Sequence, residues 1–172
     1  MPTSNLAMWP MILQLAKEVK PRRVLDVGPG HGKGAVLLRE YVGCPPIERI
    51  DAVEGWEPYV TPRLRAAYDT VLVVDVLEMA EHDLASYDLV LMVDVIEHLE
   101  KGDGLALLER IPGRVIVCTP MEFFQNPQHV QIPPEAHRSL WSLADFAGRV
   151  EMDASQLGGV LVRLGPLTGR SG

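Results

Sequence analysis

The 172-residue sequence has only 2 cysteines, Cys44 and Cys118, which stand far apart in the chain. So few cysteines do not indicate a disulfide framework, and they favour a reducing compartment. No stretch approaches the ~20 apolar residues that a membrane-spanning helix needs. The N-terminus also lacks the basic and then apolar pattern of a secretory signal peptide. We therefore expect a cytoplasmic protein that has no membrane partner.

Basic residues are scarce as well. The chain has 16 Lys and Arg against 23 Asp and Glu, a net charge of −7. Because a negative field repels phosphate, nucleic acid is disfavoured as a partner. The hydrophobic fraction of 47% and the charged fraction of 23% are those of a globular protein. The length predicts a single domain over residues 1–172.

Short apolar segments alternate with segments of helical spacing. Strands are predicted at 24–28, 48–54, 70–75, 88–94, 114–118, 149–154 and 159–164. Helices are predicted at 11–19, 34–42, within 56–67 after a Thr61-Pro62 cap, at 104–111 after an Asp103 N-cap, and near 142–147. Four strands are almost entirely apolar, as in a parallel sheet that helices cover on both faces. The order is that of a doubly wound α/β fold, and the last two strands are too close for a crossover and should pair antiparallel.

The segment 26–34 reads DVGPGHGKG and joins the first strand to a helix. Glycines allow positive φ and a close approach of ligand to backbone, and a helix N-terminus offers free amides to an anion. The dinucleotide-binding fingerprint fails because its third glycine is replaced by Lys33. A phosphate-binding P-loop fails at Val27 and Gly34.

The spacing of Asp26, Gly28, Gly30 and Gly32 resembles the first motif of the class I S-adenosylmethionine-dependent methyltransferases. The resemblance covers about residues 25–164 of the chain. It implies a Rossmann-like seven-stranded sheet of order 3-2-1-4-5-7-6, with strand 7 antiparallel. It also implies S-adenosylmethionine as the cofactor, in a small member of the family without a cap domain.

Acidic residues end the next strands, at the edge of the sheet where α/β folds bind ligands. The resemblance implies that Glu54 holds both ribose hydroxyls, which suits a carboxylate because it accepts two donors. It places Asp75 at the adenine amino group and Val76 against the ring, and Trp56 would cover the ribose or the adenine. Asp94 completes the predicted cofactor-binding residues.

The segment after the fourth strand carries candidates for chemistry. Asp94, Glu97 and His98 have the i, i+3, i+4 spacing that one face of a helical turn would share. His98 and His137 are the predicted catalytic bases, since imidazole titrates near neutral pH. Together, these four side chains (Asp94, Glu97, His98 and His137) resemble the metal sites of ubiquinone-biosynthesis O-methyltransferases and of small-RNA ribose methyltransferases. The same pattern is common in the family without a metal, and we expect none.

The acceptor must be bound without a cap domain. Residues 1–20 are predicted to lie over the cofactor, and residues 120–141 to form the acceptor side. Five apolar residues could either form an apolar wall of the acceptor pocket or pack in the core, and both roles stay open. They are Met8, Met121, Phe123, Phe124 and Trp141. Members of the family that methylate nitrogen usually carry an Asn/Asp-Pro-Pro-Tyr/Phe motif after the fourth strand. Residues 94–97 occupy that place here and do not match the motif, so a hydroxyl, carboxyl or carbon acceptor is favoured over nitrogen.

We therefore predict a methyltransferase that acts on a small molecule, at oxygen or carbon. The small size of the chain is compatible with a homodimer that completes the pocket. Three alternatives stay open. They are a non-catalytic cofactor-binding or partner-binding module of the same fold, a dinucleotide-dependent reductase, and an RNA ribose methyltransferase.

Overall fold

The computed structural model describes residues 4–43, 45–122, 135–155 and 159–166. The strands are β1 (Arg23–Val27), β2 (Arg49–Glu54), β3 (Thr70–Val73), β4 (Leu89–Val93), β5 (Arg114–Pro120), β6 (Val150–Asp153) and β7 (Gly159–Leu164). The α-helices are α1 (Trp9–Val19), α2 (Lys33–Tyr41), α3 (Pro62–Ala67), α4 (Glu81–Leu84) and α5 (Lys101–Arg110). The 3₁₀ turns are η1 (Leu6–Met8), η2 (Glu57–Tyr59), η3 (Val76–Glu78), η4 (Ile96–His98) and η6 (Leu143–Phe146). Across these ranges no helix is both long and apolar enough to cross a bilayer.

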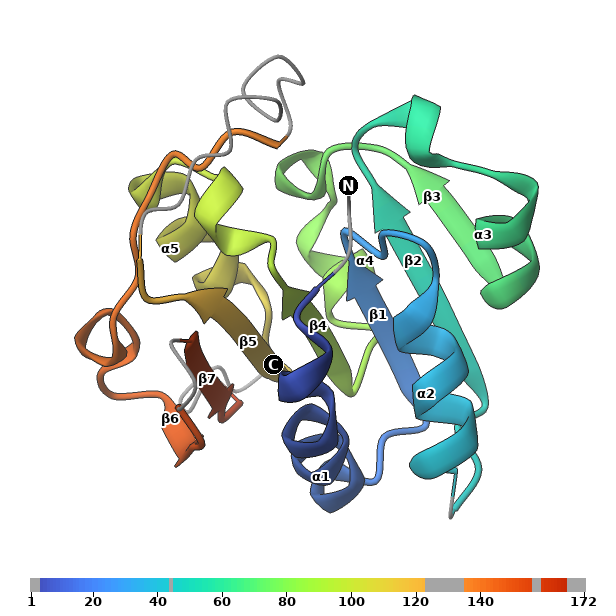
Figure 1. Ribbon diagram of the computed structural model, residues 1–172, viewed down its shortest axis with the longest axis horizontal. Coiled ribbons are helices and arrows are strands. Elements are labelled where there is room, and N and C mark those ends of the chain that lie inside the picture. Colours follow the sequence, from blue (N-terminus) through green and yellow to red (C-terminus); the bar gives the residue numbers. More distant parts are fainter. Residues whose placement is uncertain (1–3, 44, 123–134, 156–158, 167–172) are drawn as a thin grey trace.

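All seven strands form one sheet of order β3-β2-β1-β4-β5-β7-β6 (Figure 1). The first five strands are parallel, and β7 runs antiparallel to both β5 and β6. The predicted fold and strand order are therefore confirmed. β3 and β4 end earlier than predicted, at Val73 and Val93, so that Asp75 and Asp94 lie in the turns beyond the strands.

The sheet is covered on both faces, as its apolar strands predict. Val24 and Leu25 are consecutive residues of β1 and are both fully buried. They belong to two different hydrophobic clusters, one on each face of the sheet. The first cluster packs under α1, α2 and α3, and α1 and α2 lie side by side in Figure 1. The second packs under α4, α5 and η6. Burial on both faces leaves the ends of the strands as the place for polar chemistry.

The start of α5 differs from the prediction. The helix begins at Lys101 with Glu100 as its N-cap, so Asp103 lies in its first turn instead of capping it. Glycines weaken the early part of this helix. Packing explains the glycine at position 104, because a Cβ there would lie 2.7 Å from Cζ2 of Trp141. The predicted helix at 142–147 is the 3₁₀ turn η6, closed by a capping box of Ser142 and Asp145.

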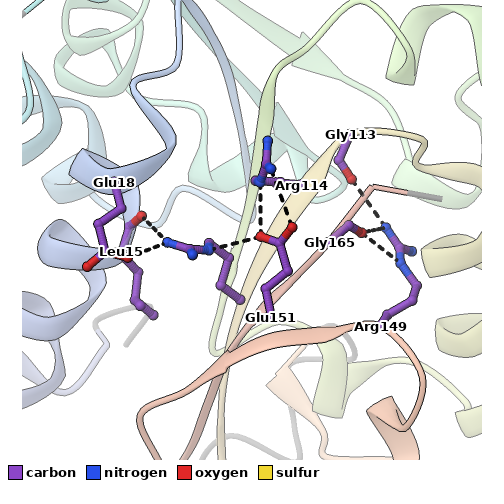
Figure 2. A network of polar contacts seen from close by, with 8 residues as sticks. Leu15, Glu18, Gly113, Arg114, Arg149, Glu151 and Gly165 are labelled. Carbon is purple, nitrogen blue, oxygen red and sulfur yellow. Dashed lines mark hydrogen bonds and ion pairs between the residues drawn. The ribbon is translucent and has the colours of Figure 1, made fainter. Parts of the chain in front are cut away.

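An arginine network ties the antiparallel hairpin to the rest of the molecule (Figure 2). Arg163 on β7 bridges Glu18 of α1 at 2.7 Å and Glu151 of β6 at 3.2 Å. Arg114 of β5 meets the same Glu151 at 3.0 Å. Arg149, before β6, donates to main-chain carbonyls in the last turn of α5, between α5 and β5, and after β7. Exposed pairs of this kind each contribute only about 0–1 kcal/mol, so the network mainly fixes where the hairpin lies.

Candidate functional site

A cavity of about 680 Å³ opens at the carboxyl ends of the parallel strands. Its walls come from the turns after β1, β2, β3 and β4, from the N-terminal residues Ser4 and Trp9, and from residues 135–138. This size is typical of small-molecule and cofactor sites. The position is the edge at which open α/β sheets bind their ligands.

The glycine turn forms the floor of this cavity. Gly28 and Gly30 line it with φ of 63° and 56°, in the left-handed region that favours glycine. A Cβ on Gly28 would lie 2.7 Å from Cγ2 of Val95, so the turn is also closely packed. Gly32 lies outside the cavity lining. It takes φ 85° as the N-cap of α2 and packs against α3.

The predicted ribose and adenine residues lie where the resemblance places them, along the turns after β2 and β3. Glu54 is buried, and its Oε1 accepts the N–H of Trp56 at 2.9 Å. Burial raises the pKa of the Glu54 carboxyl, and the nearby Glu135 carboxylate raises it further. Asp75 accepts the N–H of Leu77 at 2.9 Å and so starts η3, which brings Val76 into the lining.

The N-terminal segment is held over the far end of the glycine turn. Lys33 donates from Nζ to the carbonyl of Ser4 at 2.8 Å, and Trp9 donates from Nε1 to Ser4 Oγ at 2.8 Å. The backbone of Asn5 acts on Asp94, a cavity residue with φ 55°, and opposes the rise that burial gives to the pKa of its carboxyl. These contacts place Ser4 and Trp9 in the cavity lining, and the role predicted for residues 1–20 over the cofactor stays a prediction.

Two histidines meet on the opposite side of the cavity. The rings of His98 and His137 lie edge to face, with centroids 5.0 Å apart. His98 shares a hydrogen bond of 3.2 Å between Nδ1 and the carbonyl of Ala136. The main-chain carbonyl of Glu97 accepts the N–H groups of Arg138 at 2.7 Å and Ser139 at 3.1 Å. The segment after residue 134 is thus fastened to η4, which explains how two histidines far apart in the sequence come together.

Glu97 lies beneath this pair and is 2% exposed. Thr119 donates its hydroxyl to Glu97 Oε2 at 2.9 Å. Burial raises the pKa of Glu97 to about 8, and the charge of Asp94 acts in the same direction. Burial lowers the pKa of His98, so its imidazole is neutral at pH 7.

The predicted helical turn through Asp94, Glu97 and His98 is wrong. The left-handed φ of Asp94 interrupts the chain, and only the residues from Ile96 to His98 form a 3₁₀ turn. Glu97, His98 and His137 each offer a ligand atom within 4.8 Å of the others, so these three could share an ion. Within the described part of the chain, Asp94 is not a member of that group.

Several site residues escaped the sequence reasoning. Tyr59 donates its hydroxyl to Glu135 at 2.5 Å across the cavity lining, and Lys33 and Tyr68 hold polar groups around the glycine turn. Only the tertiary structure brings these pairs together. Of the two roles left open for the apolar side chains, core packing holds for Met8 and Trp141. Phe123 and Phe124 lie outside the described residues.

Comparison with known proteins identifies the family. A family described as "Methyltransferase domain" matches residues 7–151. No curated protein matches the sequence. Among solved structures, the N-terminal domain of EvdMO1, crystallised with SAH and D-fucose, has 14% identity and a TM-score of 0.63. The match covers 91% of this chain and 82% of that one.

Two further structures have the same fold. An O-methyltransferase family protein from Burkholderia thailandensis has 15% identity and a TM-score of 0.59, over 95% of this chain and 57% of that one. The PH0226 protein from Pyrococcus horikoshii has 14% identity and a TM-score of 0.64, over 93% of this chain and 88% of that one. The family match covers most of the chain, and the strand order and the glycine turn agree with it. The chain belongs to the class I S-adenosylmethionine-dependent methyltransferases.

Proposed function

We propose that this protein transfers the methyl group of S-adenosylmethionine to an oxygen or carbon atom of a small molecule. The cofactor would lie in the cavity with its ribose at Glu54 and its adenine beside Asp75 and Val76. When bound, it supplies a methyl group on a positively charged sulfur, which leaves well. Positioning of the acceptor can therefore supply much of the catalysis.

The charge of the cavity supports a cationic cofactor. Asp26, Glu54, Asp94 and Glu97 line it, and burial raises the pKa of each carboxyl. Buried carboxyls of this kind are stabilised by a nearby positive charge. The sulfonium and the ammonium of the cofactor both carry one. The same carboxylates, with the net charge of −7, disfavour an RNA acceptor.

His98 is the observation that carries the proposed chemistry. A hydrogen bond from Nδ1–H to the carbonyl of Ala136 leaves Nε2 as the proton acceptor. The neutral ring lines the cavity together with the cofactor residues. It is therefore placed to take the proton of a hydroxyl as the methyl group arrives, with His137 edge-on beside it as the second base.

Calorimetry tests the cofactor first. We expect micromolar binding of S-adenosylmethionine and S-adenosylhomocysteine, weakened about a hundredfold by Glu54→Ala because two hydrogen bonds to a charged group are lost. Glu57→Ala removes an exposed carboxylate outside the cavity lining and should change nothing. Absence of binding by the wild type would overturn the proposal.

Turnover is tested by release of S-adenosylhomocysteine with a panel of acceptors. Phenols, carboxylates and sugars belong in it, the sugars because D-fucose was present with EvdMO1. Release that depends on the acceptor would support an enzyme. Tight binding with no turnover across the panel would favour the alternative, a non-catalytic cofactor-binding module.

A further inference from the structure

A buried tyrosine and aspartate meet behind the glycine turn. Tyr68, at the end of α3, donates its hydroxyl to Oδ2 of Asp26 on β1 at 2.5 Å. Both side chains are buried, and Asp26 lines the cavity. A Cβ on Gly34 would lie 2.3 Å from the same Oδ2, so the glycine leaves room for the carboxyl. The tyrosine therefore fixes a carboxyl group that borders the ligand space.

A second pair of the same kind provides the contrast. Tyr87 donates to Oδ2 of Asp51 on β2 at 3.0 Å, and both residues are buried. Neither lines the cavity, and Asp51 also forms an ion pair of 2.6 Å with Arg49. Among the described residues, Asp26 has no such ion pair. Burial raises the pKa of Asp26 to about 7, and only the hydrogen bond from Tyr68 acts against this.

We propose that Tyr68 is a positioning residue that holds Asp26 for the ammonium group of the cofactor, and that this pair makes cofactor binding tighten as pH rises to neutrality. The inference rests on the proposed function, because it needs that cofactor. Only the ionised carboxylate attracts the ammonium. The apparent affinity therefore follows the ionised fraction of Asp26.

Other charged groups surround the pair and must be separated from it. They are Lys33 on α2, Glu54 after β2, Asp94 after β4, His31 in the glycine turn, and Arg39 of α2 near Tyr68. His31 lines the cavity in the same turn. The experiment therefore needs a variant that removes Asp26 ionisation and leaves His31 in place.

The test is calorimetric binding of S-adenosylhomocysteine between about pH 5.5 and 8.5. In the wild type the affinity should rise about tenfold or more and level off above about pH 8, where Asp26 is almost fully ionised. 5′-Methylthioadenosine lacks the amino acid part, and its affinity should stay constant with pH. Asp26→Asn should bind S-adenosylhomocysteine weakly, without a pH dependence.

Tyr68→Phe removes only the hydroxyl. The Asp26 pKa then rises, so the affinity curve should move about one unit to higher pH and binding at pH 7 should weaken several-fold. Tyr87→Phe is the matched control, which should lower the thermal midpoint and leave the binding curve unchanged. The difference between the two variants separates positioning from a structural role.

Each other outcome counts against the inference. If Tyr68→Phe keeps the wild-type curve and loses only stability, Tyr68 is structural. If the rise with pH survives in Asp26→Asn, another group such as His31 is responsible. If the wild type binds neither S-adenosylhomocysteine nor 5′-methylthioadenosine, the proposed function fails and the inference with it. Binding without pH dependence overturns the inference alone.

Discussion

The two sides of the cavity are built by different means. On the proposed cofactor side, the glycine turn follows β1, Glu54 ends β2, and Asp75 lies two residues after β3. The parallel register that pairs Val27 with Val53 brings these turns to one edge. On the acceptor side, His98 and His137 come from distant segments that main-chain hydrogen bonds to Glu97 join. The first side is fixed by sheet geometry, and the second depends on tertiary contacts between turns.

The largest effect should come from the acceptor side. We expect His98→Gln to lower kcat by about 10²–10⁴ without changing cofactor affinity, since the base is lost and the cofactor residues are untouched. Burial lowers the pKa of His98, so the wild-type rate should be level at neutral pH and fall only in acid, as the ring gains a proton. The rate of the His98→Gln variant should not show this fall at acid pH.

The control for this experiment is His82→Gln, which changes an exposed histidine on α4 that does not line the cavity. Its rate should match the wild type. If His98→Gln keeps the full rate with an acceptor that the wild type methylates, the acceptor side acts by positioning alone. The two sides of the cavity would then differ in how they are built and not in whether they supply a base.

The cofactor side is next in expected effect. Gly28→Ala should weaken cofactor binding at least tenfold, by about 1–2 kcal/mol of left-handed strain and by a 2.7 Å approach to Val95. The thermal midpoint should fall with it. Gly102→Ala is the matched control, because its Cβ meets nothing within 4 Å and alanine favours the helix. Equal midpoints for the two variants would contradict the tight turn.

Lys33→Met addresses the N-terminal segment beside the cofactor side. Losing the bond from Nζ to Ser4 should speed release of S-adenosylhomocysteine about three- to tenfold, as expected for one hydrogen bond. Stopped-flow displacement measures this rate. Lys17→Met, an exposed change on α1 that does not line the cavity, should leave it unaltered. An unchanged rate in Lys33→Met would mean that residues 4–9 do not retain the cofactor.

Metal removal should have the smallest effect. Dialysis against EDTA is expected to change methyl transfer less than twofold, because burial favours the uncharged form of Glu97 and one nitrogen of His98 already serves Ala136. Loss of activity that a divalent ion restores would contradict this. It would assign Glu97, His98 and His137 as metal ligands, and the acceptor side would then be a metal site.

Much of the fold could be predicted from the sequence. The apolar strands, the Thr61 cap of α3 and the acidic strand ends are local patterns, and each has one favourable structure. The resemblance carried by the glycine spacing then placed Glu54, Asp75 and Val76 in the cavity. Gly32 fits the spacing of the motif, and in the structure it is the N-cap of α2 outside the cavity lining.

The remaining features required the tertiary structure. The close approach of Trp141 explains the glycine at position 104, and the pair of Tyr68 with Asp26 joins residues whose spacing carries no signal. Sequence periodicity reports which face of an element is buried, because burial follows the repeat of a helix or strand. It does not report which polar groups meet across elements. The sequence by itself determined the sheet and its ligand edge, and only packing between turns decided how His98, His137 and Asp26 are held there.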